Sequence, residues 1–199
     1  MTWLGVVMVR DANAILRRLH DAGYEVGSLA ELRRSGTKYA KAVPILVESL
    51  SASSEDRALT EEIVRALSVP WARPAATGPL IDLFRQVDDP RELGLRWTIG
   101  NALEVVWDDR FFEDLVEIAR DKSYGRSREM VVLGIARSKR PEAADVLIDL
   151  LNDADVNGHA VKALSKFKAS RARPGLEQMT SDSRSWVRTA ARKAIRNLD

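Results

Sequence analysis

The chain of 199 residues contains no cysteine and only two histidines, His20 and His159. The lack of cysteine excludes disulfides, thiolate nucleophiles and cysteine-based zinc sites, and it is consistent with a cytoplasmic protein. Because His20 and His159 are far apart in the sequence, a histidine-rich metal site is not predicted either. We therefore expect no metal and no cofactor.

Long hydrophobic runs are also missing, since no apolar stretch reaches the length of a membrane span. The apolar segment 3–9 has no basic residue before it and no small-residue cleavage site after it, which makes it a poor signal peptide. It could pack against the first helix, form a disordered tail, or precede a true start at Met8, and these alternatives stay open. We expect no membrane partner.

Motifs that carry chemistry are scarce. The sequence has no Gly-rich phosphate loop, no Gly-x-Ser-x-Gly elbow and no His-Glu-x-x-His pattern. Adjacent carboxylates do occur, but they stand at predicted helix ends, where capping accounts for them: the pairs are Glu61-Glu62, Asp88-Asp89 and Asp108-Asp109. No catalytic residue is predicted.

Hydrophobic residues make up 45% of the chain and charged residues 30%, which is typical of a folded domain. The net charge of +2 is unevenly distributed. Residues 155–199 hold ten basic and four acidic residues, whereas the remainder holds 21 basic and 25 acidic ones. A polar end-cap of a repeat array is the favoured explanation, and an acidic partner such as a nucleic acid is the alternative.

An internal repeat organises the chain. Residues 156–167 align with residues 187–198 at an offset of 31, and their apolar positions coincide. Five small-large pairs extend the register along the chain: Ala66-Leu67, Ala102-Leu103, Gly134-Ile135, Ala163-Leu164 and Ala194-Ile195. A helical pattern repeated at this spacing predicts a solenoid, in which stacking of neighbouring pairs buries the core.

Apolar spacing and helix-end signals predict the individual helices. Helices over 11–22 and 28–34 form an atypical N-terminal cap within residues 1–37. Residues 38–199 form one continuous repeat domain, and its predicted helix pairs are 39–49 with 56–68, 79–87 with 90–106, 110–120 with 126–138, 141–151 with 156–167, and 173–179 with 185–198. Pro90 is expected in the first turn of its helix. The segment from Pro70 to Pro79 is predicted to be an irregular loop between repeats.

The last repeat resembles the HEAT repeat, in particular the short HEAT-like repeats of bacterial proteins. It carries Asp182, then Val187-Arg188, Ala190-Ala191 and Ala194-Ile195. Residues 153–164 depart from this pattern because Asn157 takes the place of the arginine, whereas Arg128 and Arg96 keep it. The resemblance is good over about residues 90–198 and weaker over 38–88. It implies an all-α, right-handed solenoid of about five HEAT-like helix pairs behind the N-terminal cap.

In that family the second helices of the pairs line the concave face, so the resemblance implies where a partner would bind. Transferring the register predicts a partner-binding surface of ten residues: Arg96, Trp97, Asn101, Arg128, Glu129, Leu133, Lys162, Lys166, Arg188 and Arg192. Trp97, Val132 and Leu133 could form an exposed apolar patch, or they could be buried between neighbouring helices. Arg96, Arg128 and Arg188 have a structural alternative, pairing with loop aspartates such as Asp153 and Asp182.

The favoured function is a non-enzymatic scaffold that binds a protein or peptide on its concave face. The alternative is nucleic-acid binding through the basic C-terminal repeats. This alternative includes the DNA alkylation-repair glycosylases, whose HEAT-like folds use tryptophan and aspartate near the lesion. Residues of these types are present at Trp97, Trp107, Asp108, Asp109 and Trp186. The acidic first three repeats argue against a DNA clamp. HEAT-like bilin lyases share the repeat and nothing more specific.

Overall fold

The computed structural model describes residues 11–52, 56–89 and 93–198, and these residues form twelve α-helices in six successive pairs. The apolar segment 3–9 and Pro90 lie outside the described residues. The pairs are α1 (Ala12–Asp21) with α2 (Leu29–Arg34), α3 (Ala42–Ala52) with α4 (Arg57–Leu67), α5 (Thr77–Gln86) with α6 (Leu95–Val105), α7 (Phe112–Arg120) with α8 (Glu129–Gly134), α9 (Ala143–Asp149) with α10 (Asn157–Leu164), and α11 (Arg173–Met179) with α12 (Ser185–Arg196).

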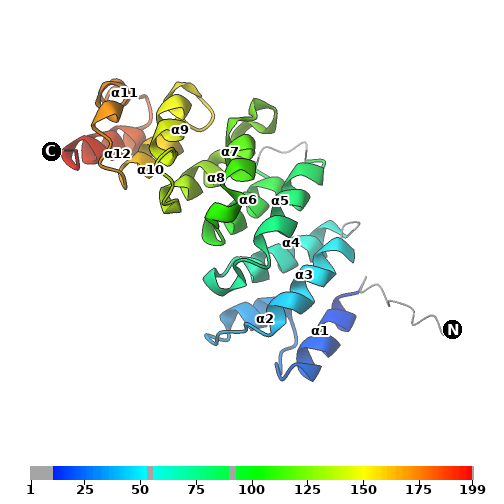
Figure 1. Cartoon of the computed structure of the whole chain (residues 1–199). Coiled ribbons are helices and arrows are strands. Elements are labelled where there is room, and N and C mark those ends of the chain that lie inside the picture. Colours follow the sequence, from blue (N-terminus) through cyan, green and yellow to red (C-terminus); the bar gives the residue numbers. More distant parts are fainter. Residues whose placement is uncertain (1–10, 53–55, 90–92, 199) are drawn as a thin grey trace.

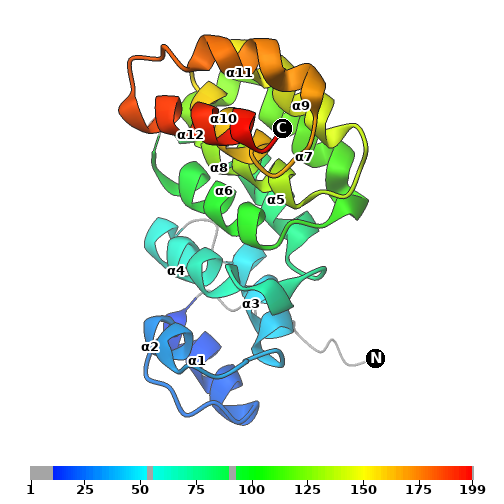
Figure 2. The ribbon, with the colours of Figure 1, turned by 90° about the vertical axis from the view of Figure 1, so that its left-hand side faces the viewer.

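The pairs stack into an elongated, curved array with α1 and α12 at its two ends (Figure 1). The second helices α2, α4, α6, α8, α10 and α12 contact one another in succession, whereas among the described residues the first helices do so extensively only for α1 and α3. Figure 2 shows α4, α6 and α8 on one side of the stack and α5, α7 and α9 on the other. Because the second helices pack more closely, the array curves around them and they form its inner face.

The all-α solenoid expected from the sequence is confirmed, with two local differences. At the predicted N-terminal cap, α1 packs on α3 and α2 on α4, so here the first helices also contact one another extensively, unlike those of the later pairs. The helix predicted over 126–138 is shorter, because 3₁₀ turns over Lys122–Arg128 and Ile135–Arg137 flank α8. Gly125 interrupts the first of these turns with φ of 51°, a conformation that glycine adopts without steric cost.

One apolar core runs through all the pairs, from Ile15 in α1 to Ala194 in α12. The small-large pairs supply much of it, and only Ile195 among them is partly exposed. The small member matters because it lets the next inner helix approach. A Cβ added at Gly134 would lie 2.8 Å from the Trp107 ring and 3.2 Å from the Glu104 Cα. The spacing of α6 and α8 is therefore set by a residue without a side chain.

Aspartates fix the turn that leads into several second helices. Asp56 accepts a hydrogen bond from the Leu59 N–H, and Asp89 accepts one from the Arg96 N–H. Asp153 and Asp182 do the same for Asp155 and Arg184. Asp56 and Asp89 satisfy N–H groups of the first helical turn, which have no partner within the helix, whereas Asp153 and Asp182 satisfy N–H groups of the turn just before it.

Acidification tests the contribution of the aspartate turns. Hydrogen bonds from Arg184 lower the pKa of Asp182 from 3.8 to about 2. Because the folded pKa lies below the unfolded one, the stabilisation is complete well above pH 3.8 and is lost as the pH falls through about 2. Asp182→Asn keeps an acceptor oxygen and loses the charge. We expect it to lower the free energy of unfolding by about 1 kcal/mol at neutral pH, and by about half as much near pH 3. Urea titrations at the two pH values measure this, and an equal loss at both would contradict the assignment.

Candidate partner-binding surface

Two hollows on the inner face of the array are lined in part by side chains of α6. On α6, Trp97, Asn101 and Glu104 follow one another at helical spacing, so they lie on the same side of that helix. Trp97 and Asn101 contribute to one hollow and Glu104 to the other. Both hollows therefore open on the side where the inner helices meet.

The larger hollow, here called the C-terminal hollow, has a volume of about 810 Å³ and is bounded by α6, α10, α12 and the end of α8. Its apolar members are Leu133, Ala136, Trp186 and Ala190. Its charged members are Glu104, Arg137, Lys162, Lys166 and Lys193. The predicted site residues Leu133, Lys162 and Lys166 are thus brought together from two different helix pairs. This combination of an apolar surface with a charged border is typical of a ligand-binding cleft.

The C-terminal hollow carries an excess of positive charge. Arg137 is neutralised by Glu104, with an Nη2–Oε1 distance of 2.7 Å. Lys162 and Lys166 are exposed, as is Lys193 on α12, and no acidic side chain in the described part of the chain pairs with any of the three. Burial lowers the pKa of the nearby His159 below 6.5, so this residue is neutral at physiological pH and adds no charge. The net charge of the hollow therefore comes from three free ammonium groups.

Trp186 is the aromatic residue of the C-terminal hollow, and the sequence-based site did not include it. Its side chain is 43% exposed, and it lies over Gly158, where an added Cβ would come within 2.4 Å of the ring. The ring of His159 lies 5.4 Å from it, centroid to centroid. The amphipathic pattern of the last helix contained the necessary signal, because Val187 and Ala191 are inward and Trp186 falls outside that buried stripe.

The smaller hollow, here called the N-terminal hollow, has a volume of about 330 Å³ and is lined by Arg33, Arg65, Ser68, Trp97, Thr98 and Asn101. Trp97 is partly buried, and its Nε1–H finds no acceptor among the described residues. The Asn101 side chain donates to the Trp97 carbonyl over 2.9 Å, which fixes the orientation of the amide. Trp97 and Asn101 thus lie side by side, but in a separate hollow from Leu133 and Lys162.

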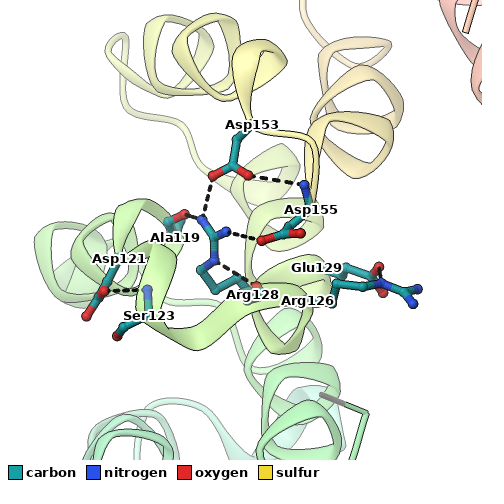
Figure 3. Close-up of polar contacts among 9 residues, drawn as sticks. Ala119, Asp121, Ser123, Arg126, Arg128, Glu129, Asp153 and Asp155 are labelled. Carbon is teal, nitrogen blue, oxygen red and sulfur yellow. Dashed lines mark hydrogen bonds and ion pairs between the residues drawn. The ribbon is translucent and has the colours of Figure 1, made fainter.

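The prediction that Arg128 contacts a partner is wrong, because its side chain is completely buried. Its guanidinium donates to the Asp153 carboxylate and to the Ala119 carbonyl, both over 2.9 Å, and to the Gly125 carbonyl over 2.8 Å (Figure 3). This confirms the alternative for Arg128, pairing with an aspartate of the next repeat. Burial of Asp153 opposes its ionisation, but the hydrogen bond and charge of Arg128 lower its pKa overall.

Two other arginines of the predicted surface, Arg96 and Arg188, are partly exposed and make internal hydrogen bonds. The Arg96 guanidinium donates to the carbonyls of Phe84 and Val87 at the end of α5, and it lies 5.0 Å over the Tyr124 ring. Arg188 donates to the carbonyls of Asp182 and Ser183, each over 2.8 Å, so it contacts the loop backbone instead of the predicted carboxylate. Both arginines hold loops of their own repeat.

Two further residues of the α8 region are buried as well. Glu129 is 7% exposed and accepts a hydrogen bond from Arg126, and Val132 is fully buried. Val132 therefore does not belong to an exposed patch, whereas Leu133 next to it is partly exposed. Arg192 is exposed on α12 but does not line either hollow.

Three of the five residues that suggested a glycosylase, Trp107, Asp108 and Asp109, are engaged in structural contacts. Trp107 is 3% exposed, and its Nε1–H donates to Asp109 over 2.9 Å. Asp109 also accepts from the Lys139 backbone in the next repeat, and these hydrogen bonds outweigh burial and lower its pKa. A bidentate hydrogen bond from Arg110 lowers the pKa of Asp108. Trp107 and the two aspartates therefore hold the α6–α7 turn.

Within residues 11–52, 56–89 and 93–198 there is no group of three or more His, Asp or Glu side chains arranged to hold a metal ion. Over the same residues, no helix is both long and apolar enough to cross a membrane.

The fold and the inner face define a class of protein, the α-helical repeat solenoids. The designed armadillo repeat protein YIII(Dq.V1)4CPAF, solved in complex with the peptide (KR)4, has a TM-score of 0.57 at 18% identity, over 94% of this chain and 92% of the other. The designed armadillo repeat protein YIII(Dq)4CqI has a TM-score of 0.51 at 17% identity, over 95% and 100% of the two chains. At these identities the likeness concerns the fold.

The kind of repeat follows from the sequence comparison. The family model for HEAT repeats matches residues 112–196, which span α7 to α12. The predicted resemblance to HEAT-like repeats is thereby confirmed for this part of the chain. A comparison with curated proteins found no match.

Proposed function

We propose that this chain is a binding scaffold that holds a segment of another protein along its inner face, between the N-terminal and C-terminal hollows. The observation that carries the proposal is the C-terminal hollow, where an apolar surface with a half-exposed tryptophan meets three unpaired lysines. A half-exposed tryptophan on a concave surface is a candidate anchor, because aromatic side chains are enriched at the centres of protein interfaces.

One of the solved structures with a similar fold supports the same kind of function. One of the designed armadillo proteins is in complex with a peptide, which makes peptide binding compatible with a fold of this shape. That peptide, (KR)4, is basic. The C-terminal hollow of the present chain is itself positively charged, so we do not expect it to accept a ligand of that charge. The partner is a protein or peptide, and no catalytic step is proposed.

Affinity capture from the native host tests the proposal. We expect the combined variant Trp97→Asp and Leu133→Asp to retain at least tenfold less of the captured protein, because a carboxylate in each hollow disfavours apolar contacts. The amount retained is measured by quantitative mass spectrometry, and circular dichroism establishes that the variant is folded.

A matched variant places the same two charges on the outer side of the array. Gln86→Asp and Gln178→Asp change exposed residues on α5 and α11, which are first helices of their pairs. This variant should capture as much as the wild type. Equal capture by the folded inner-face variant and the wild type would rule out the inner face as the binding surface.

A further inference from the structure

The charge on the inner face is concentrated at one end. A third hollow of about 520 Å³, here called the adjoining hollow, shares Ser165, Lys166 and Lys193 with the C-terminal hollow. Its other basic members are Lys168 and Arg196. Basic side chains therefore continue from Trp186 along the seam between α10 and α12, with no acidic residue among those that line the adjoining hollow.

Resting on the proposed function, we propose that this seam binds an acidic peptide segment that inserts one large apolar side chain beside Trp186. The carboxylates of the segment lie along Lys162, Lys166 and Lys193, and further along Lys168 and Arg196. Leu133, Ala136 and Ala190 complete the apolar contact. The occupant is thus identified by two properties together, negative charge and a bulky apolar anchor.

Charge complementarity favours a carboxylate ligand because the amines have no partner of their own. Many arginines elsewhere in the array pair with acidic residues of a neighbouring repeat, such as Arg85 with Asp114 and Arg120 with Asp149. Lys162, Lys166 and Lys193 form no such pair with the described residues, so their charges remain available to a ligand. Ammonium groups that are not already neutralised attract a ligand of opposite sign and increase its rate of association.

A nucleic acid fits the same features less well. Phosphate binding requires an extended basic track, but the positive charge here is confined to the last two pairs. Single-stranded nucleic acids also need successive aromatic platforms, whereas the seam holds only Trp186 in the C-terminal hollow and Phe167 in the adjoining hollow. An aliphatic or aromatic side chain of a peptide matches this surface better than a base does.

Fluorescence anisotropy with labelled peptides tests the proposal. One peptide has a Leu-Phe pair followed by four glutamates, and the other has the same residues in the reverse order. We expect at least one of the two to bind, and binding to weaken about tenfold when glutamine replaces the glutamates or when Ser-Gly replaces Leu-Phe. Binding that depends on only one of these features would overturn the two-part recognition.

Variants of the protein locate the binding. Lys162→Glu with Lys193→Glu should weaken the peptide affinity at least tenfold, and Trp186→Gln should do so about tenfold.

The control, Lys38→Glu with Lys41→Glu, changes the net charge by the same amount at exposed positions just before α3, and should alter affinity less than about twofold. Because Lys162 and Lys193 are exposed, their variants are expected to fold, and circular dichroism checks this. An equal loss in the control would show that net charge alone attracts the peptide, against the proposal.

Competing occupants give different outcomes. Tighter binding of a single-stranded oligonucleotide of equal charge, with the same dependence on the lysines, would replace the peptide by a nucleic acid. A dimer that dissociates in the Lys162→Glu, Lys193→Glu variant would assign the seam to a second copy of the chain. If neither peptide binds while the inner-face variant still loses its captured protein, this inference fails and the proposed function stands. If capture is unchanged by the inner-face variant, the proposed function fails.

Discussion

Replacing Arg128 by methionine is expected to lower the free energy of unfolding by about 3–5 kcal/mol. The side chain is fully buried and holds two carbonyls and two carboxylates from three segments of the array. Methionine fills part of the volume but leaves Asp153 nearly buried without its counter-charge, and the remaining acceptors lose their donor. Urea unfolding followed by far-ultraviolet circular dichroism measures the loss.

The surface pair between Arg120 and Asp149 provides the matched control. Both side chains are more than half exposed, and their atoms are 3.0 Å apart, close to the distance in the buried pair. Arg120→Met should therefore cost less than about 1 kcal/mol, because water solvates the carboxylate that remains. If Arg128→Met cost no more than Arg120→Met, the buried network would not hold the repeats together.

Adding a side chain at Gly134 is the second change with a large expected effect. Gly134→Val should destabilise the protein by about 3 kcal/mol, because its Cβ alone would overlap the buried Trp107 ring and press on the α6 backbone. The backbone at Gly134 is ordinary right-handed helix, so strain in φ does not contribute. The cost arises entirely from forcing α6 and α8 apart.

Ala136→Val separates this effect from a general effect of valine. Ala136 lies two residues further along the chain, is partly exposed and lines the C-terminal hollow, so the added methyl groups enter open space. We expect a change of less than about 0.5 kcal/mol. Thermal unfolding of the two variants side by side measures the difference, and similar losses would show that the close approach at Gly134 does not set the spacing.

Much of the fold follows from the periodicity of apolar residues. The spacing of the small-large pairs predicted which residues of α4, α6, α8, α10 and α12 are inward, and Ala66, Ala102 and Ala163 are indeed fully buried. Asp153 and Asp182 stand in the turns before second helices, where each accepts a hydrogen bond from the backbone N–H two residues further along. These features are local, since they depend on helix geometry and on residues a few positions apart.

The candidate site was predicted only in part, because the side chain of an arginine on the inner side of a helix can extend in either of two directions. Arg96, Arg128 and Arg188 were assigned to the surface from their place on the helix, yet all three turn back to loop carbonyls. A long side chain can reach either solvent or the preceding loop, and the path of that loop is not encoded in the periodicity. The same uncertainty applied to Val132 and Leu133, adjacent residues of which only Val132 is fully buried.

The sequence by itself determined most of the helices and their pairing, because helical periodicity and repeat spacing are properties of short segments, and the resemblance to HEAT repeats implied that the second helices form the inner face. Tertiary structure alone decided which inner-face residues are available to a partner. Exposure of Trp186 depends on how α12 sits over Gly158, and the free charge of Lys162, Lys166 and Lys193 depends on which acidic groups neighbouring repeats bring within reach. Both are set by the distance between helices that are about thirty residues apart in the chain, which no local pattern specifies.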